Sequence, residues 1–590
     1  MRRDRWRLGL AAAAVLLAAA DTYVVVVALP SIMDGVGVGL DRLQRATPII
    51  SGFLLGYTAI LPLIGRLADL AGTEPVFAGC LAAFGAGSVI TATSHALPVV
   101  VTGRAIQGLG GGGLVPVTMA MVAARWPPDS RGLPLGVVGA LQELGSVIGP
   151  LYGAAIVEIA SWRAIFWINV PVIVVLAVGF WLAGRTERPT GRTDKSSRPA
   201  GRFDFVGATL ASVGSIGLVL GLDAPSRLAT SASIGQVYAP SAGGPWAPFT
   251  TPIVLVSLAV LVAFIGWEFA PPGRVRPLVP LRKVAGVLAR ADVPGALMLA
   301  GVLACIVVAF STADPSSQVV ASSAPIVGPV AVVLAVGFFI RQRKAVNPLI
   351  EPGALAARPA WGSLAVNLSL GGALMAALID VPLFARATVD PTSEVAAALV
   401  LVRFLVAVPI GALIGGALCR RRTLAPAIAA FGMTLAAVAF VAMTSWSATS
   451  LGGGPRPSDV ALIVCGLGFG LAIAPVNVAI LGAVQPSLHA LASALAVVAR
   501  TIGMLAGLSA LTAIALHRFY QAQARIGSPL VICPNTNPTS CAPYNDATSK
   551  ALLSELHTIF GGAAVCAALA AVLAVALLRP RIRGREAASV

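Results

Sequence analysis

Long runs of apolar residues constrain this chain more than any other feature of its sequence. Segments such as 361–379 and 424–444 consist mainly of Ala, Val, Leu and Gly. They reach the ~20 residues that an α-helix needs to cross the hydrocarbon core of a bilayer. Backbone N–H and C=O groups in hydrocarbon must be paired within their own segment, so such runs are helical. The sequence therefore predicts an all-α membrane protein.

The number of these runs predicts a large helical bundle. Only 11% of the 590 residues are charged, whereas a soluble domain of this size carries about 25%. Sixteen spans are predicted, in groups of six, four and six; the middle four are short, and omitting one pair leaves fourteen. The predicted spans are 8–30, 47–65, 77–95, 99–122, 134–158 and 164–184, then 205–222, 251–269, 293–312 and 325–340, then 361–385, 393–418, 424–446, 459–483, 491–516 and 556–578.

This grouping predicts four parts of the chain. Residues 1–184 form an N-terminal six-helix bundle, and residues 361–578 form a C-terminal one. Residues 185–360 provide cytoplasmic loops and linker helices, and residues 579–590 a cytoplasmic tail.

The basic residues indicate how the chain is inserted. Of the 41 Lys and Arg residues, 29 lie in the N-terminal segment and the loops on its side, nine lie in the opposite loops, and three lie inside spans. Cytoplasmic loops are enriched in Lys and Arg. We therefore expect a multi-pass protein of the bacterial inner membrane with both termini in the cytoplasm. The basic, apolar start resembles a signal peptide, but its apolar run continues to Pro30, which favours an uncleaved first helix.

Several other classes of function are excluded. The net charge of +17 suggests nucleic-acid binding, but the basic residues are spread over many loops without an aromatic-interleaved patch. The seven Cys and four His show no metal-ligand spacing. No nucleotide-binding loop, zinc-protease motif or nucleophile elbow is present. We predict no cofactor, no metal and no enzymatic activity.

Ionisable residues deep in predicted spans are the first candidates for function, because such groups are costly in a membrane. Asp21 lies well inside the first span, and Glu143 lies about ten residues into the fifth. Each is either a carboxyl group hydrogen-bonded to neighbouring helices or a protonatable group facing a central cavity. Arg500 lies at a similar depth in the fifteenth span and is the expected counter-charge to a carboxylate.

Four further polar residues have less certain environments. Arg104 lies near the outer start of the fourth span, and Gln107 follows one turn later on the same helix face. Asp380 lies near the outer end of its span, where it either reaches the interface or serves a function. Arg403 lies about ten residues into its span, and the sequence suggests no partner for it.

Two other features concern packing and covalent structure. Gly145, Gly149 and Gly153 recur at four-residue spacing around Pro150, a pattern that lets helices approach closely. Cys533 and Cys541 lie in the long outer loop 517–555, and the flanking residues 512–525 and 548–556 are expected to continue the last two spans beyond the membrane. On the oxidising side of the membrane the two cysteines form either a disulfide or two free thiols.

Four ordered stretches in the first 185 residues resemble the fourteen-span drug:proton antiporters of the major facilitator superfamily. The stretches are 21–30 (DTYVVVVALP), 101–110 (VTGRAIQGLG), 145–153 (GSVIGPLYG) and 162–171 (WRAIFWINVP). The resemblance implies two six-helix bundles, and it implies a role in proton coupling for Arg104. The four middle spans depart from the two linker helices of that family.

The stretch 65–75 (GRLADLAGTEP) resembles the gating motif of this superfamily. It keeps Gly65, Asp69 and Gly72 but lacks the basic residues expected after Asp69. We therefore expect a weaker charge latch at this position, with Arg66 as a substitute.

A narrower resemblance is to the mycobacterial lipid exporters of the same superfamily. It rests on 21–26, 142–153 (QELGSVIGPLYG) and 498–505 (VARTIGML). It implies proton coupling and conformational switching by Asp21, Glu143 and Arg500, a triacylglycerol cargo, and an outer-face lipoprotein as partner.

Taken together, these features predict a monomeric, proton-coupled exporter of hydrophobic or lipid-like molecules that works by alternating access. Multidrug efflux is the alternative. A non-transporting receptor or scaffold is a remote one, because the 7-residue head and 12-residue tail provide no soluble output domain.

Overall fold

The structure is a computed structural model of the whole chain. It describes residues 2–38, 43–184, 202–224, 235–241, 247–269, 275–276, 281–311, 323–351, 353, 355–388, 394–419, 422–447, 449–451, 456–526, 532–533 and 541–579. Most of the predicted basic loop 185–204 and of the predicted tail 579–590 lies outside these residues.

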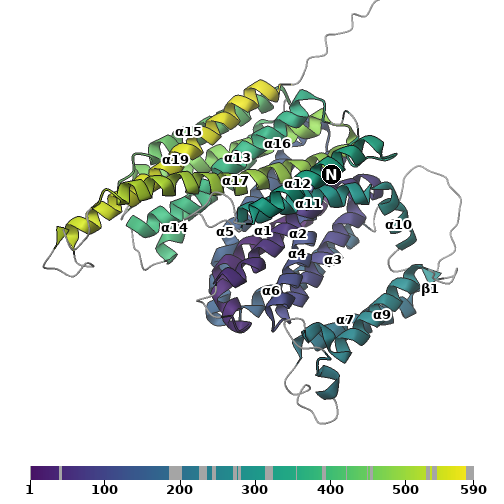
Figure 1. Cartoon of the computed structure of the whole chain (residues 1–590). Helices are drawn as coiled ribbons and strands as arrows, with labels where there is room; N and C mark the ends of the chain where they lie inside the picture. Colours follow the sequence, from purple (N-terminus) through teal and green to yellow (C-terminus); the bar gives the residue numbers. More distant parts are fainter. Residues whose placement is uncertain are drawn as a thin grey trace, which may run out of the picture.

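Six helices form the N-terminal bundle, drawn in purple and blue in Figure 1. In it α1 packs against α5, and α4 packs against α2 and α3. Its core consists of Ala, Val, Leu and Phe side chains from all six helices. The helices are α1 (Arg2–Gly35), α2 (Leu43–Ala71), α3 (Thr73–Ala92), α4 (Leu97–Arg125), α5 (Gly132–Ile159) and α6 (Arg163–Gly184).

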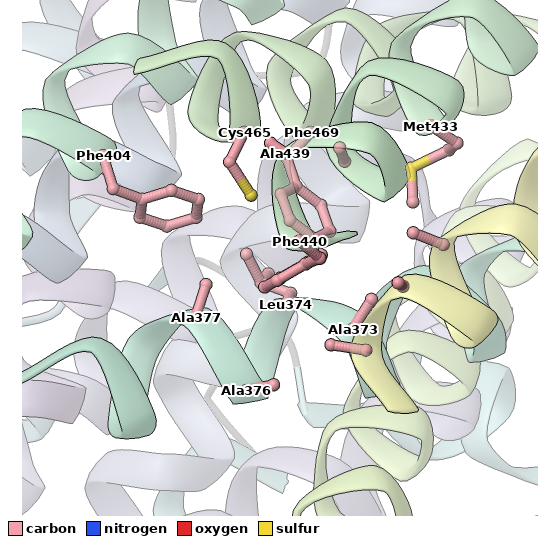
Figure 2. Close-up of a cluster of buried hydrophobic side chains, with 14 of the residues drawn as sticks. Ala373, Leu374, Ala376, Ala377, Phe404, Met433, Ala439, Phe440, Cys465 and Phe469 are labelled. Atoms are coloured by element: carbon pink, nitrogen blue, oxygen red, sulfur yellow. The ribbon is translucent and has the colours of Figure 1, made fainter. Parts of the chain in front are cut away.

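Six more helices form the C-terminal bundle, drawn from green to yellow in Figure 1. Its core contains the ring of Phe469, whose centroid lies 5.9 Å from that of Phe404 and 6.1 Å from that of Phe440 (Figure 2). The helices are α13 (Arg358–Thr388), α14 (Glu394–Leu418), α15 (Ala425–Met443), α16 (Pro457–Ala483), α17 (His489–Gln523) and α19 (Ala542–Leu577).

The segment between the bundles supplies two helix pairs and one short amphipathic helix. The first pair is α7 (Phe205–Asp223) with α9 (Pro252–Phe269), which lie side by side beyond α3 in Figure 1. The second pair is α11 (Val293–Ser311) with α12 (Ala324–Lys344), and α11 packs against α2 and α17. Helix α10 (Leu281–Arg290) meets α11 at a 72° bend. Two short parallel strands, β1 (Arg202–Phe203) and β2 (Val275–Arg276), pair nearby.

The predicted fold class is confirmed. Among the described residues, fifteen helices are long and apolar enough to cross a membrane, and the bent α10–α11 pair brings the number to sixteen. Each of the sixteen predicted spans coincides with a helix. Helices α17 and α19 are longer than their predicted spans, since α17 continues to Gln523 and α19 begins at Ala542. The short helix α10 was not among the predicted spans.

Close contacts join the two bundles at one end of the molecule, which we call the α2–α3 end. There, α5 lies against α14 so closely that a Cβ on Gly136 would lie 2.6 Å from the carbonyl oxygen of Ala412. Helix α2 meets the start of α17 in the same way, because a Cβ on Gly65 would lie 2.7 Å from Cα of Leu491. At the other end, the tips of α17 and α19 project beyond the purple helices in Figure 1.

Candidate functional site

The carboxylate of Asp21 is completely buried at the centre of the N-terminal bundle. Arg104 of α4 donates a hydrogen bond from Nη1 to Asp21 Oδ2 and forms an ion pair with it. Gln107, one turn further along α4, donates from Nε2 to Asp21 Oδ1 at 2.9 Å. The structure thus brings Asp21 together with Arg104 and Gln107, which the sequence places on one face of the fourth span.

Two polar residues that were not selected as site residues complete this network. Asn169 of α6 donates from Nδ2 to Asp21 Oδ1 at 2.8 Å. Ser88 of α3 accepts from Gln107 Nε2 at 2.9 Å, and Ser88 is also fully buried. Asn169 belonged to a recognised stretch, but its position on α6 gave no sign that it points at Asp21. The network therefore draws on α1, α3, α4 and α6.

The guanidinium of Arg104 has partners that do not depend on the charge of Asp21. It lies over the ring of Phe53 at 4.2 Å and near the ring of Phe166 at 5.7 Å from the centroid. Its Nη1 also donates to Gln107 Oε1 at 2.8 Å. Aromatic faces attract such a cation, and arginine keeps its charge in proteins. Arg104 is therefore held in place by contacts other than its ion pair with Asp21.

A second ion pair joins the two bundles. Arg500 of α17 donates from Nη1 to Glu143 Oε1 of α5 at 3.0 Å, and the two side chains are 11% and 9% exposed. The counter-charge that the sequence predicted for Arg500 is thus Glu143. Because the partners belong to different bundles, this ion pair can form only while α5 and α17 lie side by side as they do in the structure.

The Glu143–Arg500 pair lies in the wall of a cavity between the bundles. About 680 Å³ of space in this region is free of protein atoms, including space open to solvent. The lining mixes apolar side chains with hydroxyl and amide groups: Ala18, Ala19, Thr22, Tyr23, Leu54, Tyr57, Val115, Gln142, Glu143, Ser146, Leu374, Val497, Arg500, Thr501 and Met504. A cavity of this kind suits an amphipathic or apolar molecule.

The gating motif contacts the start of α17. Both carboxylate oxygens of Asp69 accept hydrogen bonds at 3.0 Å, one from the backbone N–H of Ala490 and one from that of Leu491. These are among the N–H groups that a helix leaves unpaired at its N-terminus, where its dipole favours negative charge. Gly72 ends the motif with φ +91°, a conformation that favours glycine. Asp69 thus ties α2 of one bundle to α17 of the other.

Two charged residues of the stretch 65–75, Glu74 and Arg66, form other ion pairs. Glu74 lies 2.9 Å from Arg7 of α1 and 2.5 Å from Arg125 of α4. Arg66 pairs with Glu351, just before α13, at 3.3 Å. The acidic Glu74 therefore joins helices of the N-terminal bundle, while Arg66 reaches toward the C-terminal one.

The glycines of the stretch 145–153 let α5 lie directly against α1. A Cβ on Gly145 would lie 2.6 Å from Cβ of Ala19, and one on Gly149 or Gly153 would overlap Ala20 or Val24. Pro150 lies inside the helix between them. This close approach positions the α1 segment that carries Asp21.

Two residues with uncertain environments are now located. Arg403 of α14 pairs with Asp459 in the first turn of α16, so it has the partner that the sequence did not reveal. Asp380 is 2% exposed and therefore does not reach the surface of the bundle.

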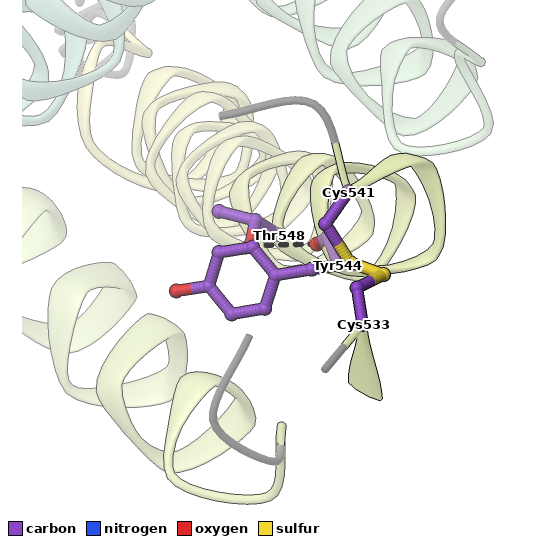
Figure 3. The surroundings of a disulfide bond; sticks show 4 residues. All are labelled: Cys533, Cys541, Tyr544 and Thr548. Atoms are coloured by element: carbon purple, nitrogen blue, oxygen red, sulfur yellow. Dashed lines mark hydrogen bonds between the residues drawn. A yellow bond between two sulfur atoms is a disulfide. The ribbon is translucent and has the colours of Figure 1, made fainter. Parts of the chain in front are cut away.

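The two cysteines of the α17–α19 connection are bonded in the structure. Cys533 and Cys541 form a disulfide directly before α19 (Figure 3). On the next turn, Thr548 donates to the backbone oxygen of Tyr544 at 2.9 Å. Among the described residues, no group of three or more His, Cys, Asp or Glu side chains is arranged to hold a metal ion.

Comparison with known proteins agrees with this geometry. The profile of the Major Facilitator Superfamily matches residues 11–339, more than half of the chain. This chain belongs to the major facilitator superfamily. It is a multi-pass membrane transporter, as the sequence analysis predicted. Transporters of this superfamily bind their cargo between the two halves, and the cavity with Glu143 and Arg500 likewise lies between the two bundles.

Individual members of the superfamily match over most of the chain. A triacylglyceride transporter of Mycolicibacterium hassiacum is 36% identical over 519 residues, covering 86% of this chain and 78% of that protein. A triacylglyceride transporter of Mycolicibacterium smegmatis is 36% identical over 526 residues, covering 87% and 76%. One from Mycobacterium tuberculosis is 34% identical over 540 residues, covering 89% and 85%. The predicted resemblance to lipid exporters is confirmed by these relatives.

Proposed function

We propose that this major facilitator transporter exports triacylglycerides or similar lipids, driven by protons that bind to Asp21. The names of its relatives support the cargo. Proton coupling is supported by the fully buried Asp21. Its carboxylate accepts hydrogen bonds from Arg104, Gln107 and Asn169. An ionisable group of this kind inside a membrane protein is a functional candidate by default.

The contacts of Asp21 suggest how protonation acts. When Asp21 is ionised, its charge holds α1 against α4 through Arg104. When it is protonated, Arg104 keeps Gln107 and the ring of Phe53, and the attraction between α1 and α4 is lost. Because α1 also lines the cavity through Thr22 and Tyr23, the proton and the cargo act on the same helix.

Glu143 provides the link to the movement of the bundles. Its ion pair with Arg500 crosses from α5 to α17. Protonation of Glu143 would remove the attraction and allow one bundle to rock against the other. In this account Asp21 and Glu143 take up protons from outside, and their neutralisation permits the return of the empty transporter.

Two features support the sidedness of this scheme. The loops at the α2–α3 end belong to the side that carries 29 of the 41 basic residues, so we assign this end to the cytoplasm of the bacterial inner membrane, with both termini inside. Asp69 closes this end by capping α17. The structure then corresponds to an outward-facing transporter.

The extended helices suggest a path for the cargo. With 35 residues, α17 is about 52 Å long, whereas the hydrocarbon core is ~30 Å thick. The tips of α17 and α19 would therefore stand above the membrane, with the Cys533–Cys541 bond at their connection. We assign this projection to lipid transfer toward an outer-face lipoprotein, from a transporter that works as a monomer.

Multidrug efflux is the second candidate, and one observation favours it. The cavity between the bundles carries the polar groups of Tyr23, Gln142 and Ser146 beside its apolar lining, which suits an amphipathic drug. A lipid with three acyl chains needs a wider or laterally open cavity.

A complementation experiment separates the two cargoes. Wild type or Asp21→Asn would be expressed in a mycobacterial strain that lacks its own triacylglyceride transporter. We expect wild type to restore triacylglyceride in the outer envelope, and Asp21→Asn, at equal expression, to fail. Restored drug resistance without restored lipid would identify a drug pump, and restoration of lipid by Asp21→Asn would exclude Asp21 as the coupling residue.

A further inference from the structure

Helix α10 is short, and its two faces differ in chemistry. Its sequence is LRKVAGVLAR. Apolar residues recur at intervals of three and four and therefore share one face of the helix: Leu281, Val284, Ala285 and Leu288. The three basic residues lie on the opposite face: Arg282, Lys283 and Arg290. Helix α10 is thus amphipathic, with an apolar face and a basic face.

The protein leaves both faces of α10 largely uncovered. Helix α10 contacts α2, α9 and α11, but none of its ten residues is buried. On the apolar face, Val284 is 41% exposed. Apolar side chains in this position are costly in water, whereas the boundary between lipid headgroups and acyl chains covers them.

The basic residues of α10 have no acidic partner among the described residues. Arg282 and Lys283 are exposed, and Arg290 donates from Nε to the backbone oxygen of Gly286 at 3.2 Å. Neighbouring helices differ in this respect. Arg66 of α2 pairs with Glu351, and Arg341 of α12 pairs with Asp292. The positive charge of α10 is therefore available to a partner outside the described chain.

The bend between α10 and α11 turns α10 toward the plane of the membrane. Helix α11 follows the predicted span 293–312, and α10 meets it at 72°. Asp292 holds this bend with φ +45°. Its Oδ1 accepts hydrogen bonds from the backbone N–H of Gly295 at 3.3 Å and from Arg341 Nε at 2.6 Å. Helix α10 thus extends sideways from the end of a membrane helix.

Helix α10 lies on the side of the molecule that we assign to the cytoplasm. In Figure 1 it is found on the side where N marks the start of the chain, away from the projecting tips of α17 and α19. The cytoplasmic leaflet has a negative surface potential, which comes from its anionic lipids. The basic face of α10 therefore has the charge opposite to that of the surface beside it.

We propose that α10 is a binding surface for anionic phospholipids of the cytoplasmic leaflet. Its apolar face enters the boundary of the leaflet, and its basic side chains bind the phosphate groups of the lipids. Helices with one apolar face and Lys or Arg on the other bind membranes in this way. The partner is a lipid rather than a soluble anion, because the apolar face needs cover as well as the charges. The surface is distinct from the cargo cavity and from Asp21, and it uses only the orientation given in the proposed function.

Hydrogen exchange of the full chain in nanodiscs tests this proposal. The discs would contain phosphatidylcholine alone or an equal mixture of phosphatidylcholine and phosphatidylglycerol. We expect the amides of α10 to exchange more slowly in the mixture, by about fivefold for each basic residue that binds a headgroup. The difference should shrink at high salt, because salt screens exposed charges.

Three variants separate the charge of α10 from its fold. The triple variant Arg282→Gln, Lys283→Gln and Arg290→Gln should lose the difference between the two lipids, because glutamine favours the helix but carries no charge. Arg282→Lys combined with Arg290→Lys keeps the charge and should behave like wild type. Lys344→Gln removes an exposed charge from the last turn of α12 and is the matched control, which should leave the exchange of α10 unchanged.

Photocrosslinking tests contact with the lipid itself. Photoactivatable phosphatidylglycerol should crosslink to residues 281–290 more than photoactivatable phosphatidylcholine does, and the triple glutamine variant should lose this preference. Equal exchange of α10 in the two kinds of disc, or equal crosslinking by the two lipids, would overturn the proposal. Inorganic phosphate that slows exchange in phosphatidylcholine discs as much as phosphatidylglycerol does would also overturn it, since the site would then bind a free anion.

These measurements do not involve transport. Failure of the Asp21→Asn experiment would therefore leave the lipid surface of α10 unaffected, and failure here would leave proton-coupled export unaffected.

Discussion

Glu143 of α5 and Arg500 of α17 lie 3.0 Å apart and form an ion pair between the two helix bundles. Both side chains line the cavity in which a cargo would bind. The contact between the bundles, the ion pair and the proposed cargo site therefore lie at one position. An alternating-access transporter needs this arrangement, because the binding of cargo or a proton must determine on which side of the membrane the cavity opens.

The ion pair gives the first prediction. Glu143→Gln leaves the Arg500 guanidinium without its counter-charge, and breaking a buried pair costs roughly 3–5 kcal/mol. Spin-label distances between α5 and α17 should show a smaller outward-facing population than in wild type. The double variant Glu143→Leu with Arg500→Met should recover stability because no unpaired charge remains. Equal populations in wild type and Glu143→Gln would contradict the role of this pair.

Asp69 gives the second prediction. Asp69→Asn keeps the size of the side chain but loses the charge that caps α17, an effect of about 1 kcal/mol. The α2–α3 end should open more often, which increases the labelling of a cysteine introduced at Ala490. The exposed Asp129, replaced by Asn, is the control. Unchanged labelling in Asp69→Asn would show that the charge of Asp69 does not help to close this end.

The α1–α5 interface gives the third prediction. Gly149→Ala places a methyl group against the backbone of Ala20, and overpacking of this kind costs about 1–3 kcal/mol. The melting temperature of the detergent-purified protein should fall, and proton-driven transport should fall with it because Asp21 is displaced. Gly266→Ala on α9, where a Cβ has no neighbour within 4 Å, should leave both unchanged.

The disulfide gives the fourth prediction. Cys533 and Cys541 are eight residues apart, and closing a loop of this length stabilises it by about 2–3 kcal/mol. In Cys533→Ser, hydrogen exchange should become faster in the first turns of α19, around Tyr544 and Thr548. Exchange near Asp21 should stay the same. Protection at Tyr544 that equals wild type would mean that the disulfide does not order this turn.

The sequence was sufficient for the helices because each span is set by its own apolar run. The bilayer admits one secondary structure for such runs, and all sixteen spans were therefore predictable. The continuation of α17 and α19 beyond the membrane was expected from the residues that flank loop 517–555, but their exact ends at Gln523 and Ala542 were less predictable, because a helix that leaves the membrane no longer has an apolar signal. Helix α10 is short and amphipathic, and no rule for spans applies to it.

The sequence predicted the charged residues of the site but not the contacts that they make. Asp21, Glu143 and Arg500 stood out because a charge in a long apolar run is rare. Ser88 and Asn169 are uncharged and common in membrane helices, so their contact with the Asp21 network followed only from the packing of α3 and α6. The partner of Arg403 was missed because Asp459 lies at a helix start, where an acidic residue is ordinary.

The central claim, that Asp21 couples proton uptake to lipid export, is tested most directly in proteoliposomes. Proton flux and the movement of a fluorescent triacylglyceride would be recorded together, with a pH gradient imposed across the membrane. The account predicts coupled flux of both in wild type and neither in Asp21→Asn, with the control Asp546→Asn, an exposed residue of α19 paired with Lys550, behaving like wild type. Lipid export by Asp21→Asn that still follows the pH gradient would contradict it.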